Sequence, residues 1–373
     1  MKLAFYVNYL NHHQVAVADE LYRLLGEDFT FVATYPRNGA ELKGGEDYSM
    51  RPYCLLAAER DDAYQKAMKL LQEVDVAVIG GGNLDYEVAR AKTGKLTFEM
   101  SERWLKRGWF NVLSPLVLKN LYYYYTLFKH KSIYKLCCSG YAASDCAKLG
   151  AYKNRCYKWG YFTGVGVENM STAARNSTVS ILWSARFLQL KHPELPVKMA
   201  TRLKHAGYRF TLHMYGEGVE QKNTQALVHQ YGVEDVVRFM GNIPNAELLR
   251  EMSQHEIFLF TSNQLEGWGA VVNEAMSNGC VPVVSDAAGC APYLIKDGEN
   301  GLLFKSGNTD ALTEKVRWLL DHPMERRKMR EAAVRHIKTL WNSGHAAESL
   351  LQLSTDLLNG KESSITEGPG SIA

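Results

Sequence analysis

The sequence predicts an α/β protein built from two doubly wound parallel-sheet domains. The first observation is its length of 373 residues, about two and a half times that of a usual single domain. The second is that short apolar runs alternate with amphipathic stretches, a pattern typical of parallel strands covered by helices on both faces. The third is that this series occurs twice, separated by a polar, glycine-bearing segment at residues 163–177, which we interpret as an interdomain linker.

The first series indicates an N-terminal Rossmann-like domain at residues 1–165. Its apolar runs predict strands at residues 3–7, 29–34 and 74–79, and its amphipathic stretches predict helices at 14–25 and 61–73. Further runs at 96–99, 133–138 and 156–159 continue the expected sheet.

The second series indicates a C-terminal Rossmann-like domain at residues 178–340. Strands are expected at 179–185, 210–216, 236–241, 256–262 and 280–286. A helical pattern follows, and we expect a last helix at 341–359 that packs back on the N-terminal domain. The tail at 360–373 has few apolar residues, so we expect it to be disordered.

Composition excludes several classes of protein. With 46% hydrophobic and 22% charged residues the chain reads as globular, not disordered. Its longest apolar stretch, 109–128, is interrupted by polar residues and a lysine, so no membrane span is predicted. The first residues read as a strand and not as a signal peptide, and the seven cysteines include no Cys-x-x-Cys pair. We therefore expect a cytoplasmic protein with reduced thiols.

The stretch from residue 265 to 304 carries the most informative motif. Glu266 follows a predicted strand and precedes Gly267, Trp268 and Gly269, after which a helix is expected. The amino end of a helix is a ready anion site, and Glu274 lies about 7 to 8 Å along that helix from its start. Two carboxylates, which accept hydrogen bonds from sugar hydroxyls, thus flank a site suited to a diphosphate.

This stretch resembles the retaining GT-B glycosyltransferases, particularly glycosyltransferase family 4, the glycosyl transferases group 1. The matching pieces are Glu266-Gly-Trp-Gly, Glu274-Ala-Met-x-x-Gly279, Val281-Pro-Val-Val-Ser and Gly298-x-x-Gly301-Leu-Leu-Phe. The resemblance implies a GT-B fold, in which two Rossmann-like domains face a central cleft. It also implies hexosyl transfer, with retention, from a nucleotide-sugar donor to an acceptor hydroxyl in polysaccharide, glycolipid or glycoconjugate synthesis.

The resemblance assigns roles to residues of the C-terminal domain. Glu266 is expected to contact the donor sugar and Glu274 the ribose, while Arg186 and Lys191 hold the diphosphate. A fixed pair of cations would stabilise the charge that develops on the departing diphosphate. The alternative for Arg186 and Lys191 is a solvated pair at a strand end. Further donor-binding candidates are the glycine turns and the expected base-binding loop, namely Gly216, Gly241 and Ile243.

Site candidates in the N-terminal domain are less specific. Asn11, His12 and His13 follow the first strand, at the strand edge where open α/β sheets bind ligands; their alternative role is to cap the next helix. Phe98 stands where many relatives carry a histidine. Three candidates for the acceptor side of the cleft follow it, namely Glu99, Glu102 and Arg103. Their alternative role is also local capping.

No Asp-x-Asp pair and no His/Cys cluster at metal-ligand spacing occurs in the sequence. We therefore expect chemistry without a bound metal and without any cofactor besides the nucleotide-sugar substrate. Two alternatives stay open, a GT-B nucleotide-sugar 2-epimerase and a catalytically inactive GT-B binding scaffold.

The segment 103–135 mixes basic with aromatic residues and has no acidic residue. Such a composition favours contact with an anionic membrane surface. It leads us to expect peripheral contact at the inner face of the cell membrane and a saccharide or lipid-linked saccharide acceptor. The alternative is a buried helix with solvated lysines. No motif for nucleic-acid binding accompanies the segment, so we expect no nucleic-acid partner.

Overall fold

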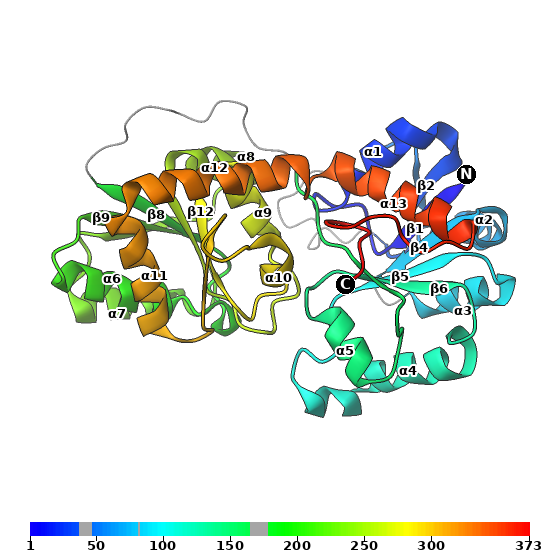
Figure 1. The fold of residues 1–373 in the computed structure, drawn as a ribbon, viewed down its shortest axis with the longest axis horizontal. Helices are drawn as coiled ribbons and strands as arrows, with labels where there is room; N and C mark the ends of the chain where they lie inside the picture. The colour runs from blue at the N-terminus through cyan, green and yellow to red at the C-terminus, as the bar shows by residue number, and fades with distance from the viewer. Residues whose placement is uncertain (37–46, 81–82, 165–177) are drawn as a thin grey trace. The chain divides into compact units, whose positions relative to one another are not determined.

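The computed structural model describes residues 1–36, 47–80, 83–164 and 178–373, and it divides into two compact units (Figure 1). The N-terminal unit contains residues 1–163 and 341–373, and the C-terminal unit contains residues 164–340. Each unit is built around one parallel sheet, so the predicted fold class is confirmed.

The sheet of the N-terminal unit has seven parallel strands in the order β3-β2-β1-β4-β5-β6-β7. These are β1 (Leu3–Val7), β2 (Phe29–Ala33), β3 (Cys54–Leu56), β4 (Val76–Gly80), β5 (Thr97–Ser101), β6 (Ile133–Cys137) and β7 (Cys156–Lys158). The helices are α1 (Val15–Leu25), η1 (Gly26–Asp28), α2 (Asp61–Glu73), α3 (Leu84–Thr93), η2 (Trp109–Leu113), α4 (Pro115–Tyr123), η3 (Tyr124–Phe128), α5 (Ala142–Lys148) and α13 (Ser343–Leu358). All five residues of β1 are buried, as expected of a central strand covered on both faces.

The sheet of the C-terminal unit has six parallel strands in the order β10-β9-β8-β11-β12-β13. These are β8 (Val179–Ser184), β9 (Phe210–Tyr215), β10 (Val237–Gly241), β11 (Ile257–Phe260), β12 (Val281–Ser285) and β13 (Leu302–Phe304). The helices are η4 (Gln189–Lys191), α6 (Glu194–His205), α7 (Gln221–Tyr231), α8 (Asn245–Gln254), α9 (Ala270–Ser277), α10 (Ala291–Leu294), α11 (Thr309–Asp321) and α12 (Pro323–Thr339). Apolar side chains from these strands and helices form one core.

Both sheets reverse their strand order once. In each sheet the first strand lies in the interior, the next two lie on one side of it, and the later strands lie on the other. The reversal falls between β1 and β4 in the N-terminal unit and between β8 and β11 in the C-terminal unit. In open α/β sheets, ligands bind outside the carboxyl ends of the strands at such a reversal.

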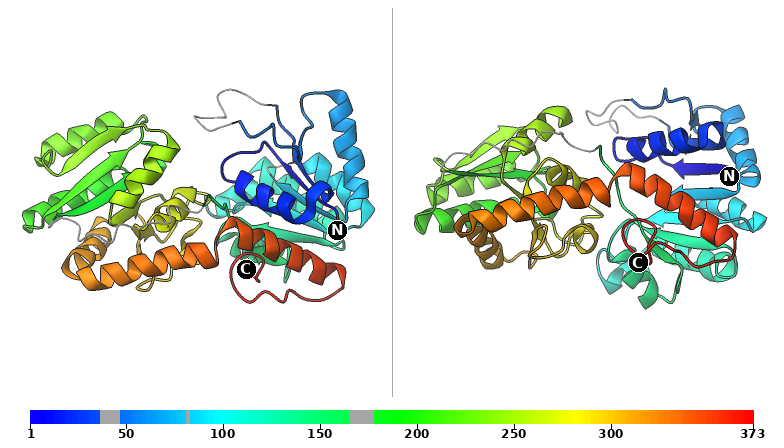
Figure 2. Two further views of the ribbon diagram at one scale, coloured as in Figure 1. Left: turned by 90° about the horizontal axis from the view of Figure 1, so that it is seen from above. Right: turned by 45° about the horizontal axis from the view of Figure 1, so that its top comes forward.

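In the C-terminal segment the tail differs from the prediction, whereas the last helix lies on the N-terminal unit. Helix α13 lies beside α1 (Figures 1 and 2). The tail at 360–373, expected to be disordered, instead pairs with β7: Lys158 donates its N–H to the Ser371 carbonyl (2.8 Å), and Ala373 donates to that of Cys156 (3.0 Å). The physical reason is that the edge strand offers unpaired backbone groups, which a polar segment satisfies without needing apolar side chains.

In the described part of the chain, no helix is both long enough and apolar enough to cross a membrane.

Candidate active site

The reversal point of the C-terminal sheet brings together two of the predicted catalytic residues. Lys191 ends η4, which follows β8, and Glu266 lies in the loop that follows β11. The Lys191 ammonium and the Glu266 carboxylate form an ion pair. Their side chains are 15% and 16% exposed, so each remains within reach of a ligand.

Hydrogen bonds from β8 and β11 fix the backbone that carries this ion pair. The Trp183 indole N–H donates to the Thr261 hydroxyl (2.9 Å), and that hydroxyl donates to the carbonyl of Lys191 (2.6 Å). Asn263 donates its N–H to the Leu190 carbonyl (2.9 Å). The two loops are therefore joined by buried or half-buried bonds as well as by the ion pair, which is the kind of preorganisation that favours charge stabilisation.

Gly269 precedes α9 and adopts φ of 102°. A Cβ atom at this position would lie 2.5 Å from Cζ of Phe260, so any larger residue would collide with that ring. Phe260 also carries the Lys191 ammonium above its face, 5.6 Å from the ring centroid. Because the first N–H groups of a helix have no intrahelical partner, α9 begins with free donors next to the Phe260 ring.

Gly267 and Trp268 are buried beside this turn. The Trp268 indole donates to the Asn273 side-chain oxygen (2.9 Å), which ties the turn to the first part of α9. Trp268 is therefore placed as a packing residue of the loop.

Glu274 is buried within α9, with 6% of its surface exposed. Burial raises the pKa of its carboxyl group to about 7, against a weaker opposing effect of the Asn245 amide, which donates to it across 3.5 Å. A carboxylate with so little solvation is well suited to accept hydrogen bonds from a ligand that replaces the missing water.

The remaining donor-site candidates lie on neighbouring strand ends. Gly216 has φ of 113°, and a Cβ atom there would lie 2.1 Å from the Ala185 carbonyl oxygen. Its N–H donates to the Gly241 carbonyl (2.7 Å), which joins the ends of β9 and β10. Ile243 is half-buried just before α8.

Arg186 does not join the Lys191 and Glu266 pair. Its side chain is exposed, and among the described residues it has no hydrogen bond or ion pair. The alternative of a solvated pair at a strand end does not describe Lys191, whose partner is Glu266. That alternative fits Arg186, whose side chain is exposed and free to move toward an anionic ligand.

In the N-terminal unit, the residues after β1 cap helix α1. Some of their buried polar atoms form no hydrogen bond to another described residue. The Asn11 side chain accepts from the His13 N–H (2.9 Å), and the Asn11 carbonyl accepts from the N–H groups at the start of α1. His12 and His13 lie with ring centroids 3.7 Å apart, and burial together with His12 lowers the pKa of His13 to about 3. The Nδ1 atom of the neutral His13 and the side-chain oxygens of Asn8 and Gln14 are buried and have no hydrogen-bond partner among the residues that the structure describes.

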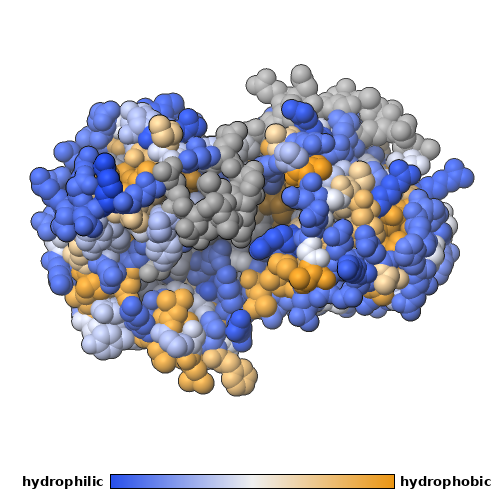
Figure 3. Space-filling view, turned by 180° about the vertical axis from the view of Figure 1, so that it is seen from behind, coloured by the Kyte–Doolittle hydropathy of each residue, from blue (hydrophilic) through white to orange (hydrophobic). Residues whose placement is uncertain are grey.

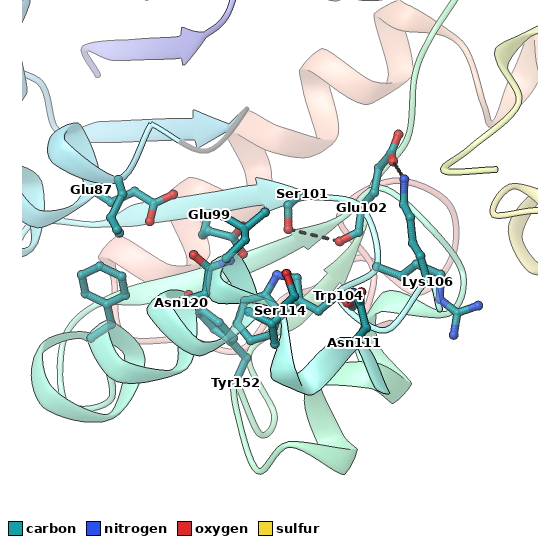
Figure 4. A pocket seen from close by; sticks show the side chains of 15 residues that line it. Glu87, Glu99, Ser101, Glu102, Trp104, Lys106, Asn111, Ser114, Asn120 and Tyr152 are labelled. Atoms are coloured by element: carbon teal, nitrogen blue, oxygen red, sulfur yellow. Dashed lines mark hydrogen bonds and ion pairs between the residues drawn. The ribbon is translucent and has the colours of Figure 1, made fainter. Parts of the chain in front are cut away.

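Glu99, Glu102 and Arg103 come together at one pocket of the N-terminal unit (Figure 4). Each is already paired: Glu99 with Lys135, Glu102 with Lys106, and Arg103 with Asp145 across 3.0 Å. The Arg103 pair is largely buried and joins the segment after β5 to α5. Arg103 is thus placed as a structural residue of this unit.

Several residues that build these sites were missed from the sequence. Thr261 lies at the end of the strand predicted at 256–262 and Asn263 directly follows it, and this position of two polar residues could have marked them. Asn245 follows a proline at the start of a helix, where its amide has an ordinary capping interpretation. Glu87 gave no signal, because charged residues of a helix usually face solvent, and Lys135 gave none, because its partner Glu99 lies on a different strand.

The C-terminal part of the chain is similar to known proteins. Residues 170–336 match the family described as Glycosyl transferases group 1. Over 184 residues the chain is 37% identical to a D-inositol 3-phosphate glycosyltransferase of Corynebacterium aurimucosum, covering 46% of this chain and 43% of that protein. Over 151 residues it is 27% identical to an MMP alpha-(1->4)-mannosyltransferase of Mycolicibacterium hassiacum, covering 39% of this chain and 36% of the relative. The matched part spans less than half the length of such curated relatives.

Solved structures extend the likeness over nearly the whole chain at the level of fold. Anabaena HepE in complex with UDP matches with a TM-score of 0.70 at 14% identity, covering 96% of this chain and 100% of that one. A glycosyltransferase from Rickettsia africae matches with a TM-score of 0.69 at 14% identity, covering 96% and 99%. Residues 170–336 thus match the glycosyl transferases group 1 family, and the two parallel sheets have the GT-B architecture of the solved structures.

Proposed function

We propose that this protein is a retaining glycosyltransferase that moves a hexosyl group from a nucleotide-sugar to an acceptor hydroxyl. The observation that carries the proposal is the Lys191 and Glu266 ion pair at the reversal point of the C-terminal sheet, beside the start of α9. Together with the family match, this arrangement offers a cation, a carboxylate and free backbone donors where a ligand is expected to bind.

The C-terminal unit would act on the donor. The diphosphate would bind at the start of α9, with Lys191 and the exposed Arg186 closing on its negative charge. As the glycosidic bond breaks, charge grows on the departing diphosphate, and these fixed cations stabilise it. Glu266, held by Lys191, would accept hydrogen bonds from the donor sugar, and the buried Glu274 from the ribose.

Structures of Anabaena HepE contain UDP, UDP-glucose, or UDP and glucose, so UDP-sugars are the first donors to test. The purified chain is mixed with UDP-glucose and candidate saccharide acceptors, and the anomeric configuration of the product is read by proton NMR. We expect an α-linked product from the α-linked donor. Release of a β-linked product would contradict the retaining assignment.

The same assay without acceptor separates transfer from epimerisation. A transferase leaves the stereochemistry of the donor sugar unchanged, whereas an epimerase inverts one of its carbons. Appearance of an isomeric UDP-sugar in the absence of acceptor would favour the epimerase.

We further propose that the acceptor is lipid-linked and reached at an anionic membrane, at the cytoplasmic face. Apolar side chains gather at one end of the N-terminal unit (Figure 3). We call this group the apolar ridge; it consists of exposed residues of η2, α4 and η3, namely Trp109, Phe110, Leu113, Leu116, Leu118, Tyr122 and Tyr125. The exposed basic residues Arg107, Lys119 and Lys129 belong to the same segment.

Burial sorts this segment into two parts. Trp104, Tyr124, Phe128 and Lys135 lie in the interior, whereas Phe110 is 88% and Leu113 is 74% exposed. Apolar side chains exposed to this degree, with lysines and arginines beside them, suit the interface of an anionic bilayer.

Sedimentation with vesicles tests the membrane proposal. We expect the protein to sediment with phosphatidylserine-containing vesicles at low salt and to remain in the supernatant with neutral vesicles. A Phe110→Ser/Leu113→Ser variant should lose the binding, while Val219→Ser, at a position that is 78% exposed in the C-terminal unit, should retain it. Equal sedimentation of both variants would remove the ridge from the proposal.

A further inference from the structure

The pocket of the N-terminal unit has features that the proposed transfer reaction does not use. Its volume is about 320 Å³, at the small end of the range of roughly 300–1,000 Å³ for small-molecule sites. It lies at the carboxyl end of β5, between α3 and α4, and side chains of both helices point into it (Figure 4). A ligand of monosaccharide size is what such a volume accommodates.

The charged groups at this pocket do not balance. Glu99, Glu102 and Arg103 each have an ionic partner, in Lys135, Lys106 and Asp145 respectively. Glu87, from α3, is 9% exposed, and its carboxyl group has no hydrogen bond or ion pair with any residue that the structure describes. One carboxyl group is therefore left without an ionic partner in a nearly dry site, where it can ionise only when a cation compensates its charge.

We propose that this pocket binds an amine-bearing ligand of monosaccharide size, with its ammonium group paired to the Glu87 carboxylate. Ser114 and Asn120 line the same pocket and have hydroxyl and amide groups that make no side-chain hydrogen bond to another described residue. They supply donors and acceptors for the hydroxyl groups of an amino sugar. The inference concerns the N-terminal unit alone and stands whether or not the C-terminal unit transfers a sugar.

The surroundings of Glu87 give the interaction a pH signature. Burial raises the pKa of Glu87 to about 8, the neighbouring Glu99 adds to this, and Lys135 opposes it. The other charged groups at the pocket, Glu102, Arg103 and Lys106, are paired among themselves or with α5. The empty pocket therefore holds a proton on Glu87 at neutral pH, and an incoming ammonium group displaces it.

The sign of the pH dependence follows from this exchange. Below the pKa of Glu87 in the empty pocket, each decrease of one pH unit lowers the ionised fraction of Glu87 about tenfold. The affinity for an ammonium ligand therefore falls by about the same factor. Between pH 7 and pH 6 we expect close to a tenfold loss. A neutral sugar, which needs no ionised carboxylate, should show no such loss.

Calorimetric titration of the full chain with glucosamine, glucose and N-acetylglucosamine tests the proposal. In two buffers of different ionisation enthalpy at pH 7, glucosamine should bind with release of about one proton. Glucose and N-acetylglucosamine should bind at least tenfold more weakly. Equal affinity for the three sugars, or no detectable glucosamine binding, would overturn the inference.

Variants assign the binding to this pocket. Glu87→Gln should weaken glucosamine binding at least tenfold and remove the proton release, while Glu299→Gln, at an exposed position of the C-terminal unit, should change neither. Ser114→Phe should narrow the pocket while leaving the Glu87 side chain unaltered, and it should also weaken binding. Unchanged glucosamine affinity in folded Glu87→Gln protein, judged by circular dichroism, would refute the assignment. Nucleotide binding should persist in both pocket variants, which separates this result from a failure of the proposed transferase.

Discussion

The buried carboxyl group of Glu274 makes the protein less stable at neutral and alkaline pH. Its pKa is about 7 in the folded protein, against a reference value of 4.5, because burial disfavours the charged form. Between these two pH values the unfolded chain releases the proton while the folded chain keeps it. Stability from this group therefore decreases as pH rises from 4.5 and is fully lost above 7.

The size of this loss in stability follows from the difference between the folded and unfolded pKa values of Glu274. A separation of about 2.5 pH units at about 1.4 kcal/mol each is on the order of 3 kcal/mol, and little solvent screening applies to so buried a group. Glu274→Gln removes the ionisation. We expect it to raise the free energy of unfolding at pH 8 by up to that amount and to change it little at pH 4.5.

Urea denaturation of the wild type and the Glu274→Gln variant at pH 4.5 and pH 8 measures the difference. The matched control is Glu299→Gln, which replaces an exposed carboxyl group. It should change the free energy of unfolding by the same small amount at both pH values. An equal effect of Glu274→Gln at the two pH values would refute the reasoning. The variant should also bind nucleotide more weakly, since it removes the carboxylate expected to accept from the ribose, so stability and binding should change in opposite directions.

Three further outcomes are expected. Replacing Arg186 or Lys191 by Ala should cost about 2 to 4 kcal/mol in transition-state stabilisation, read as a drop in kcat/KM; unchanged kinetics in both variants would remove the diphosphate assignment. Gly269→Ala should lower both thermal stability and activity, because its methyl group meets the Phe260 ring in a backbone conformation that alanine disfavours; an unaffected melting temperature would show that the turn relaxes freely. Transfer should continue in EDTA, since cationic side chains and the start of α9 supply the positive charge, and loss of activity restored by a divalent cation would contradict this.

The sequence predicted the strands and most helices because buried parallel strands have strong apolar runs. It did not predict β3 or β13, since a strand of three residues leaves too short a run. The ordered tail was missed for a different reason. Its contacts are backbone hydrogen bonds to the edge of β7, and no side-chain pattern reports them.

The sequence named candidate residues for the site but not their contacts. The motif around Glu266 and Glu274 is local in the sequence, so its resemblance to a known family could mark it before any contact was known. The Lys191 and Glu266 ion pair joins two loops far apart in the chain, and it depends on β8 and β11 being neighbours in the sheet. Glu87 and Lys135 are harder still, because the burial of a charged residue depends on packing that local composition does not describe.

Nucleotide binding by the Lys191 and Glu266 site is the most direct test of the central claim. Thermal or chemical unfolding is followed with UDP, GDP, ADP and CDP in turn, for the wild type and for Lys191→Ala. A nucleotide present at 100 times its dissociation constant should stabilise the folded wild type by roughly 2.7 kcal/mol. We expect at least one of the four to do so, and we expect the Lys191→Ala variant to respond much less at the same concentration. Equal stabilisation of both proteins, or none by any of the four, would contradict it.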